Sequence, residues 1–258
     1  MGSAIVRKIT SQELSLRGDR LVQRSGRARL VLFVFTAGAA ATSCTLAVPQ
    51  PIDSTRALTP AAAADSLSTS VAYRRIEREV VVELNAARRD PAGYAAYLAE
   101  LIPMFDGNVL RRPNHPVGVR TVEGAAAVRE AVGALRAQAP EPQLSFVQGL
   151  ATAARDLAVD QGRTGAVGHT GSDGSTPATR ISRHGAWGVS YAENIDYGDF
   201  TSGRDVVLGL LIDDGVPDRG HRHNIFDSSA RVVGVSCARH PKFGSVCVID
   251  QAGAFTAR

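Results

Sequence analysis

Two histidines in glycine-flanked polar segments are the side chains of this sequence that are best suited to chemistry. His169 lies in the segment Gly168–Gly174 and His221 in the segment Asp218–Phe226, with Glu193 between them in the chain. Glycine-rich loops let a ligand approach the backbone closely, and imidazoles with a carboxylate either bind a divalent metal or transfer protons. The sequence contains no short metal motif such as H-E-x-x-H, so spacing alone leaves open whether these residues share a site or are ordinary polar loop residues.

The elements that must position these residues change in character along the chain. The first half has apolar residues at helical spacing, which predicts helices over residues 73–89, 91–102, 121–137 and 146–161, the last with Ser145 as its N-cap. The second half has strand signals over 189–197, a helix over Asp205–Ile212 and a hairpin over 231–253. Early helices and late antiparallel strands, without a βαβ rhythm, favour an α+β fold with layers of helices and sheet.

The cysteines predict one disulfide. Cys237 and Cys247 flank a segment that contains Pro241 and Gly244, and both flanks are rich in β-formers, so the two thiols are expected on facing strands of a hairpin. A cross-strand disulfide fits that arrangement. A metal-binding pair is the alternative, but the spacing is far from C-x-x-C.

The N-terminal sequence is typical of an export signal. Basic residues end at Arg29, an apolar run of about a dozen residues follows, and small residues precede Cys44. The run is shorter than the ~20 residues that span a bilayer as a helix. We expect residues 1–43 to be a signal peptide of the lipoprotein type with Cys44 as the lipidated first residue of the mature chain; an ordinary signal peptide is the alternative. Residues 44–69, rich in Pro, Ser, Thr and Ala, predict a flexible tether, and residues 70–258 predict the folded domain.

Charge argues against a nucleic-acid partner. The formal net charge of +4 and the pI near 9.2 come from the leader, because residues 1–43 hold seven basic and two acidic residues. The remainder holds 22 basic and 23 acidic residues and therefore lacks a basic excess. We expect an exported protein that is extracellular, periplasmic or anchored to the membrane by a lipid at Cys44.

Four ordered landmarks resemble a known family. They are the segments Gly168–Gly174, Ala192–Ile195, Asp218–Phe226 and Val233–Val235, and the opening Glu83–Arg88 is similar to the first helix of the same family. Together they resemble the bacterial branch of the CAP superfamily, the cysteine-rich secretory, antigen 5 and pathogenesis-related proteins, also called the SCP domain. The resemblance covers about residues 72–256.

The resemblance implies an α-β-α sandwich, in which helices flank a central antiparallel sheet, and a cleft that bears two histidines and two acids. His169 and His221 match the two histidines, and Glu193 matches the glutamate of the E-N-[IL] motif. The W-x-x-E helix of many eukaryotic members is absent here, so Asp213 or Asp214 is the candidate for the fourth position. Several members hold a divalent cation such as zinc in this cleft, which makes His169, His221, Glu193 and Asp214 candidate metal ligands.

Three functions follow from this reading. The first is a ligand-binding or interaction module for a small lipid-like or peptide ligand. The second is a metal-assisted hydrolase of the peptidase type, with His169 and His221 in the catalytic set and Glu193 as general base, since zinc lowers the pKa of a bound water toward ~7. The third is a structural envelope protein in which these residues only hold loops together. The resemblance does not choose between them, and enzymatic activity stays open.

Overall fold

The computed structural model describes residues 6–7, 60–113 and 118–258, with side chains described from residue 69 onward apart from the gap. The predicted signal peptide, apart from the two-residue strand β1 (Val6–Arg7), lies outside these residues, as do Cys44, residues 44–59 of the predicted tether and His115.

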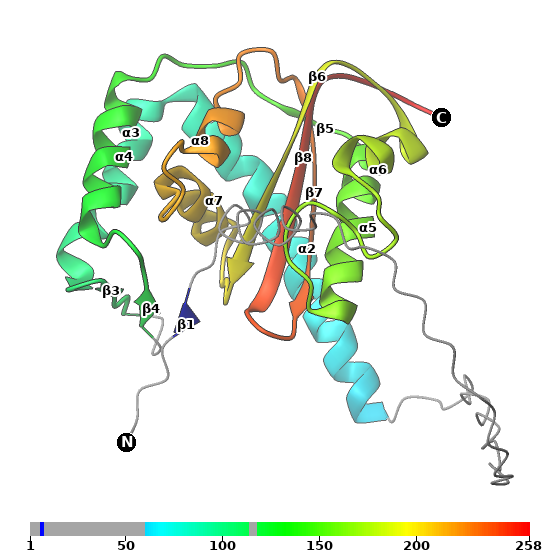
Figure 1. Cartoon of the computed structure of the whole chain (residues 1–258), viewed down its shortest axis with the longest axis horizontal. Helices are drawn as coiled ribbons and strands as arrows, with labels where there is room; N and C mark the ends of the chain where they lie inside the picture. The colour runs from blue at the N-terminus through cyan, green and yellow to red at the C-terminus, as the bar shows by residue number, and fades with distance from the viewer. Residues whose placement is uncertain (1–5, 8–59, 114–117) are drawn as a thin grey trace, which may run out of the picture.

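The protein has three layers, with helices on both faces of a four-stranded sheet (Figure 1). The sheet has the order β5-β7-β8-β6, from β5 (Ser145–Phe146), β7 (Val232–His240), β8 (Gly244–Ala257) and β6 (Gly185–Gly198). All pairings are antiparallel except the short parallel pairing of β5 with β7. The predicted α+β sandwich around an antiparallel sheet is confirmed, and β6 forms one edge of that sheet.

Two helices cover one face of the sheet and the remaining helices lie on the other (Figure 1). The first pair is α5 (Gln148–Thr164) and α6 (Pro177–His184). The other helices are α2 (Pro60–Arg89), α3 (Pro91–Ala99), the 3₁₀ turn η1 (Ile102–Met104), α4 (Ala125–Ala137), α7 (Gly203–Ile212) and α8 (Gly220–Ile225). Between η1 and α4 the chain forms β2 (Phe105–Asp106), β3 (Val109–Leu110) and β4 (Val119–Arg120), a small sheet in which β1 also pairs with β4.

The helical core follows the spacing that the sequence predicts. Ile76, Val80 and Leu84 form the buried face of α2, and Asp90 ends this helix while capping α3 through Gly93 N. Among the residues that the structure describes, no helix is both long and apolar enough to cross a membrane.

Three predicted boundaries are corrected. α2 begins at Pro60, so residues 60–69 of the predicted tether are helical; Pro fits the first helical turn, and the alanines that follow are the strongest helix formers. Ser145 is not an N-cap but lies on β5, and Val147 precedes the helix, which leaves Phe146 exposed. The helix expected from residue 121 begins at Ala125.

Two close contacts hold the layers together. Gly234 of β7 lies so near α5 that a Cβ there would sit 2.0 Å from Ala151 N, so only glycine allows this approach. On the other face, the buried guanidinium of Arg88 donates to the carbonyls of Pro142, Ile225, Asp227 and Ala230. Arg88 thereby fixes the end of α2 to the segment that leads from α8 into β7.

The predicted disulfide is confirmed, since Cys237 and Cys247 face each other across β7 and β8 and are bonded. Both sulfurs belong to the core between the sheet and α2. His240, in the same hairpin, is buried, and its Nε2 donates to the carbonyl of Ala166. The tight turn of the hairpin folds this ring back against Tyr197 and Phe243.

Replacing Cys237 and Cys247 together by alanine is expected to lower the free energy of unfolding by about 2.5–3 kcal/mol, because the disulfide closes a short loop in the unfolded chain. Urea denaturation of the double variant measures this difference, and the reduced wild type is the matched control. A loss below about 1 kcal/mol in both would show that the hairpin is held by strand pairing alone.

Candidate functional site

The edge strand β6 holds both predicted histidines through consecutive residues. Glu193 accepts a hydrogen bond from His169 Nδ1 at 2.8 Å, and Asn194 Nδ2 donates to the backbone carbonyl of His221 at 3.1 Å. Side chains alternate between the faces of a strand, so Glu193 faces the α5–α6 layer and Asn194 faces α8. The two histidines therefore approach the same sheet edge from opposite faces.

Asp213 is the acid that partners His221. His221 Nδ1 donates to Asp213 Oδ1 at 2.6 Å, and the backbone N–H of His221 donates to Oδ2 at 2.9 Å. Asp213 ends α7 in the left-handed conformation, with φ of 55°, which aspartate tolerates better than most residues. That backbone turn brings the short carboxylate to the N-terminus of α8. Of the two candidate aspartates, Asp213 is therefore the one that contacts His221.

Asp214 does not join the histidines. Its two carboxylate oxygens accept the backbone N–H groups of Val122 and Glu123 at 2.7 and 2.8 Å, at the entry to α4. Asp214 therefore has a structural role, because both oxygens bind the loop before α4, and its role as a metal ligand stays a prediction.

Glu193 has an additional partner that sequence reasoning missed. Arg180 on α6 donates to Glu193 Oε2 at 2.6 Å and to the carbonyl of His169 at 3.0 Å, and both charged side chains are 1% exposed. A buried ion pair with further hydrogen bonds compensates the loss of hydration. No motif near Arg180 in the sequence predicts its contact with Glu193, because that contact forms only when α6 packs against β6.

A second buried carboxyl lies opposite Glu193. Asp250 of β8 pairs with Glu193 across the strands and is fully buried. Within the described part of the chain, neither of its oxygens has a hydrogen-bond donor. Burial, followed by the negative charge of Glu193, raises the pKa of Asp250 well above the ordinary range of an aspartate. Asp250 therefore keeps its proton to a higher pH than an ordinary aspartate does. No motif in the sequence indicates this role of Asp250.

The two histidines have the geometry of oriented imidazoles. Each bonds a carboxylate through Nδ1, which fixes the orientation of the ring. The described residues contain no cluster of three or more His, Cys, Asp or Glu side chains that would hold a metal ion. Glu193 and Asp213 are the hydrogen-bond partners of the two imidazoles.

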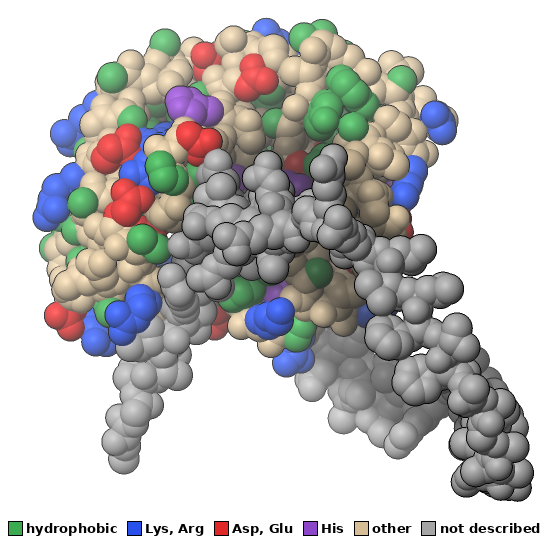
Figure 2. Space-filling model, in the orientation of Figure 1, with side chains coloured by type: hydrophobic (Ala, Val, Ile, Leu, Met, Phe, Trp, Pro, Cys, Tyr) green, Lys and Arg blue, Asp and Glu red, His purple; other side chains and the backbone are tan. Residues whose placement is uncertain are grey.

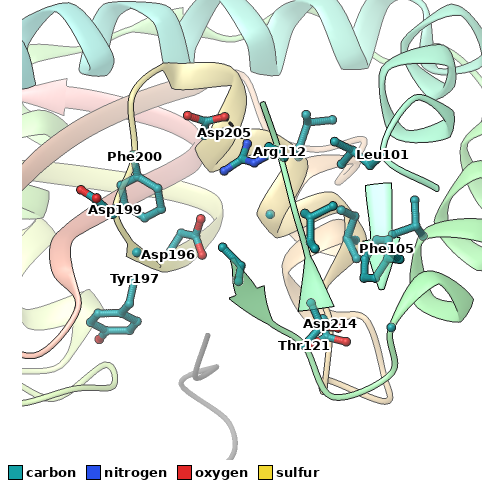
Figure 3. Close-up of a pocket in the computed structure, with 18 residues that line it drawn as sticks. Leu101, Phe105, Arg112, Thr121, Asp196, Tyr197, Asp199, Phe200, Asp205 and Asp214 are labelled. Atoms are coloured by element: carbon teal, nitrogen blue, oxygen red, sulfur yellow. Dashed lines mark hydrogen bonds and ion pairs between the residues drawn. The ribbon is translucent and has the colours of Figure 1, made fainter. Parts of the chain in front are cut away.

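A cavity of about 170 Å³ lies beyond the C-terminal end of β6 (Figure 3). Its wall is mostly apolar and comes from Leu101, the small sheet, α4, α7, and the end of β6 with the two residues that follow it. The apolar lining side chains include Leu101, Phe105, Leu110, Val128, Leu208 and Ile212. Asp214, next to the partner of His221, lies on the same wall, so the cavity adjoins the histidine site.

The charged residues that line this cavity are one arginine, Arg112, and four aspartates, Asp196, Asp199, Asp205 and Asp214. Arg112 forms an ion pair with Asp205 at the cavity wall (Figure 3). Burial alone would raise the pKa of Asp205, but the charge of Arg112 and hydrogen bonds from Thr201 together lower it, so the carboxylate is ionised. Arg112 Nε is buried and meets no acceptor among the described residues. The cavity thus joins an apolar interior to the guanidinium of Arg112, whose side chain is 19% exposed.

The model of the CAP family, described as the cysteine-rich secretory protein family, matches residues 129–250. The chain contains a CAP domain. The match runs from α4 to β8 and includes every histidine-site residue described above, whereas the resemblance read from the sequence extends to residue 72. A comparison with curated proteins finds no match.

Several solved structures are similar to the CAP domain. An extracellular protein containing an SCP domain from Bacillus anthracis is 17% identical with a TM-score of 0.36, and the match covers 50% of this chain and 38% of that one. An outer surface protein from Borrelia burgdorferi is 18% identical with a TM-score of 0.37, covering 46% and 80%. A cysteine-rich secretory protein from Staphylococcus aureus is 15% identical with a TM-score of 0.34, covering 49% and 35%.

Replacing Asp250 by asparagine is expected to flatten the pH dependence of stability. The folded CAP domain keeps the Asp250 proton at pH values where the unfolded chain, with an ordinary pKa of about 3.9, has lost it. Stability therefore falls as pH rises from about 4 toward the folded-state pKa, by at most about 1.4 kcal/mol per pH unit for one proton.

The measurement is urea denaturation between pH 4 and pH 8. Asp250→Asn should gain stability over the wild type progressively as pH rises, while the exposed control Asp199→Asn should follow the wild type. A constant difference across this range would contradict a protonated Asp250.

Proposed function

We propose that this CAP-domain protein is an exported ligand-binding module that takes a small amphipathic, lipid-like molecule. The observation that carries the proposal is the apolar cavity with Arg112 at its wall. A pocket with an apolar lining and few polar groups is typical of a small-molecule site. An apolar chain would fill the interior, and a carboxylate or hydroxyl head would lie against the partly exposed guanidinium of Arg112.

The volume of the cavity limits the size of the ligand that it can enclose. Engineered apolar cavities of about 150 Å³ bind molecules of the size of benzene, so a cavity of about 170 Å³ takes the end of an acyl chain rather than a whole lipid. The remainder of a longer ligand would lie outside the cavity. Export rests on the leader, with its basic stretch, short apolar run and Cys44.

Hydrolysis by a Glu193 general base is the weaker alternative. Both carboxylate oxygens of Glu193 already accept hydrogen bonds, from His169 and Arg180, and the side chain is 1% exposed. A general base needs an oxygen within reach of the proton that it removes. The arrangement therefore favours Glu193 as a residue that orients His169.

Filling the cavity is expected to abolish ligand binding. Ile212→Trp adds volume to the α7 wall, and Ile212→Ala removes it, so the first variant should lose binding and the second should prefer longer chains. The measurement is isothermal titration with straight-chain fatty acids of increasing length, with thermal unfolding to confirm that each variant folds. Val82→Trp, at an exposed position of α2 outside the cavity, is the control. Unchanged binding in Ile212→Trp would locate the ligand elsewhere.

A bound divalent metal is a second candidate property, favoured by the two oriented imidazoles. When bound, the metal would supply a Lewis acid held by His169 and His221. Zinc titration of the purified chain is expected to show one site that the double variant His169→Ala/His221→Ala lacks and that the Asp214→Asn variant retains. A site lost equally in Asp214→Asn would contradict the structural role given to Asp214.

A further inference from the structure

The sheet has a second edge whose surroundings differ from those of the histidine site. β5 pairs with β7 only at Val232 and Val233, where Ser145 and Phe146 lie opposite. The chain then enters α5 at Gln148, so β5 does not cover the rest of β7. The sheet order makes this the edge opposite β6.

A groove of about 1210 Å³ follows this edge between α2 and α5. Its floor is the part of β7 from Val235 to Arg239, and its walls are formed by one side of each helix. Phe146 and Val159, both about half exposed, and Val81 supply apolar surface along the groove. Exposed apolar side chains beside an open strand edge mark a surface for an extended chain.

Backbone groups of β7 point into the groove. Val233 O accepts from Val147 N, and Cys237 N donates to Glu77 Oε1 at 2.8 Å, which shows that these residues direct their backbone groups toward this edge. Val235 lies midway between them, and alternation along a strand directs its N–H and C=O to the same edge. The Glu77 carboxylate thus occupies the place that a carbonyl of a neighbouring strand would occupy.

The positive charge of the groove favours an acidic partner. Four exposed arginines line it, namely Arg74 and Arg78 on α2, Arg155 on α5 and Arg239 on β7. Glu77 is the one acidic lining residue, and its carboxylate is already engaged by Cys237 and Ser236. An occupant that carries carboxylates would meet arginines from both helices and from the strand.

We infer that this groove binds an extended acidic peptide segment of a protein partner, which adds a strand to the β7 edge. Backbone hydrogen bonds at Val235 would supply affinity independent of sequence. Carboxylates of the peptide would pair with the arginines, and its apolar residues would contact Phe146 and Val159. The interaction surface lies away from the cavity, so it does not rest on the proposed lipid-like ligand.

The test uses the full chain and a fluorescein-labelled peptide of alternating glutamate and valine, with fluorescence anisotropy as the readout. The double variant Arg74→Glu/Arg155→Glu should weaken binding about tenfold or more. The matched variant Arg129→Glu/Arg136→Glu changes two exposed arginines of α4 outside the groove and should bind as the wild type does. Peptides with lysine in place of glutamate, or proline in place of valine, should not bind, because proline lacks the N–H for strand pairing.

Amide hydrogen exchange at Val235 separates strand addition from simple charge attraction. Bound peptide should increase the protection of the Val235 N–H at least about tenfold. Equal binding of the proline peptide, or unchanged Val235 protection, would overturn the proposal. Full protection of Val235 in the free chain would assign the groove to the protein's own N-terminal segment, and protection that rises with protein concentration would assign it to a second copy; either result overturns an acidic partner.

Discussion

The buried carboxylate of Glu193 is the interaction on which the histidine site depends. An ionised glutamate that is 1% exposed is stable only when charge and hydrogen bonds compensate the lost hydration, and here Arg180 and His169 supply both. Arg180 also binds the backbone of the His169 loop, so the ion pair fixes α6, the loop and β6 together. The pKa of Asp250 opposite Glu193 is raised by burial and then by the adjacent negative charge of Glu193.

Side chains alternate between the two faces of a strand, which explains why the edge strand β6 contacts both helical layers. Glu193 and Asn194 are neighbours, yet they hold groups from opposite faces of the sheet. The opposite edge is built differently, because β5 covers only the start of β7 and leaves strand groups directed into a groove lined by arginines. The two edges therefore offer distinct chemistry: oriented imidazoles and a neighbouring apolar cavity at one, and backbone pairing with cationic side chains at the other. Figure 2 shows hydrophobic side chains gathered near the upper end of β6, and the exposed Trp187, Val189 and Tyr191 lie on that strand.

The cavity depends on the segment between α3 and α4. This segment forms η1 and the small sheet, which place Leu101, Phe105 and Leu110 opposite α7. Asp214 holds the entry to α4 by binding two backbone N–H groups, and Asp213 beside it holds His221. Consecutive aspartates at the end of α7 thus connect the wall of the cavity to the histidine site through one short turn of backbone.

Local patterns along the chain predict the layered α+β fold, the helix faces of the first half and the disulfide, and they single out His169, His221 and Glu193 as candidate site residues. These features depend on local periodicity, turn residues and short ordered motifs, which can be read along the chain. The contact of His221 with Asp213, and not with Asp214, follows from the tertiary structure alone. The same holds for the positions of Arg180 and Asp250 beside Glu193. Those choices depend on a left-handed turn at the end of a helix, on a helix crossing a strand and on the register of two strands. Each brings together residues that no local pattern connects.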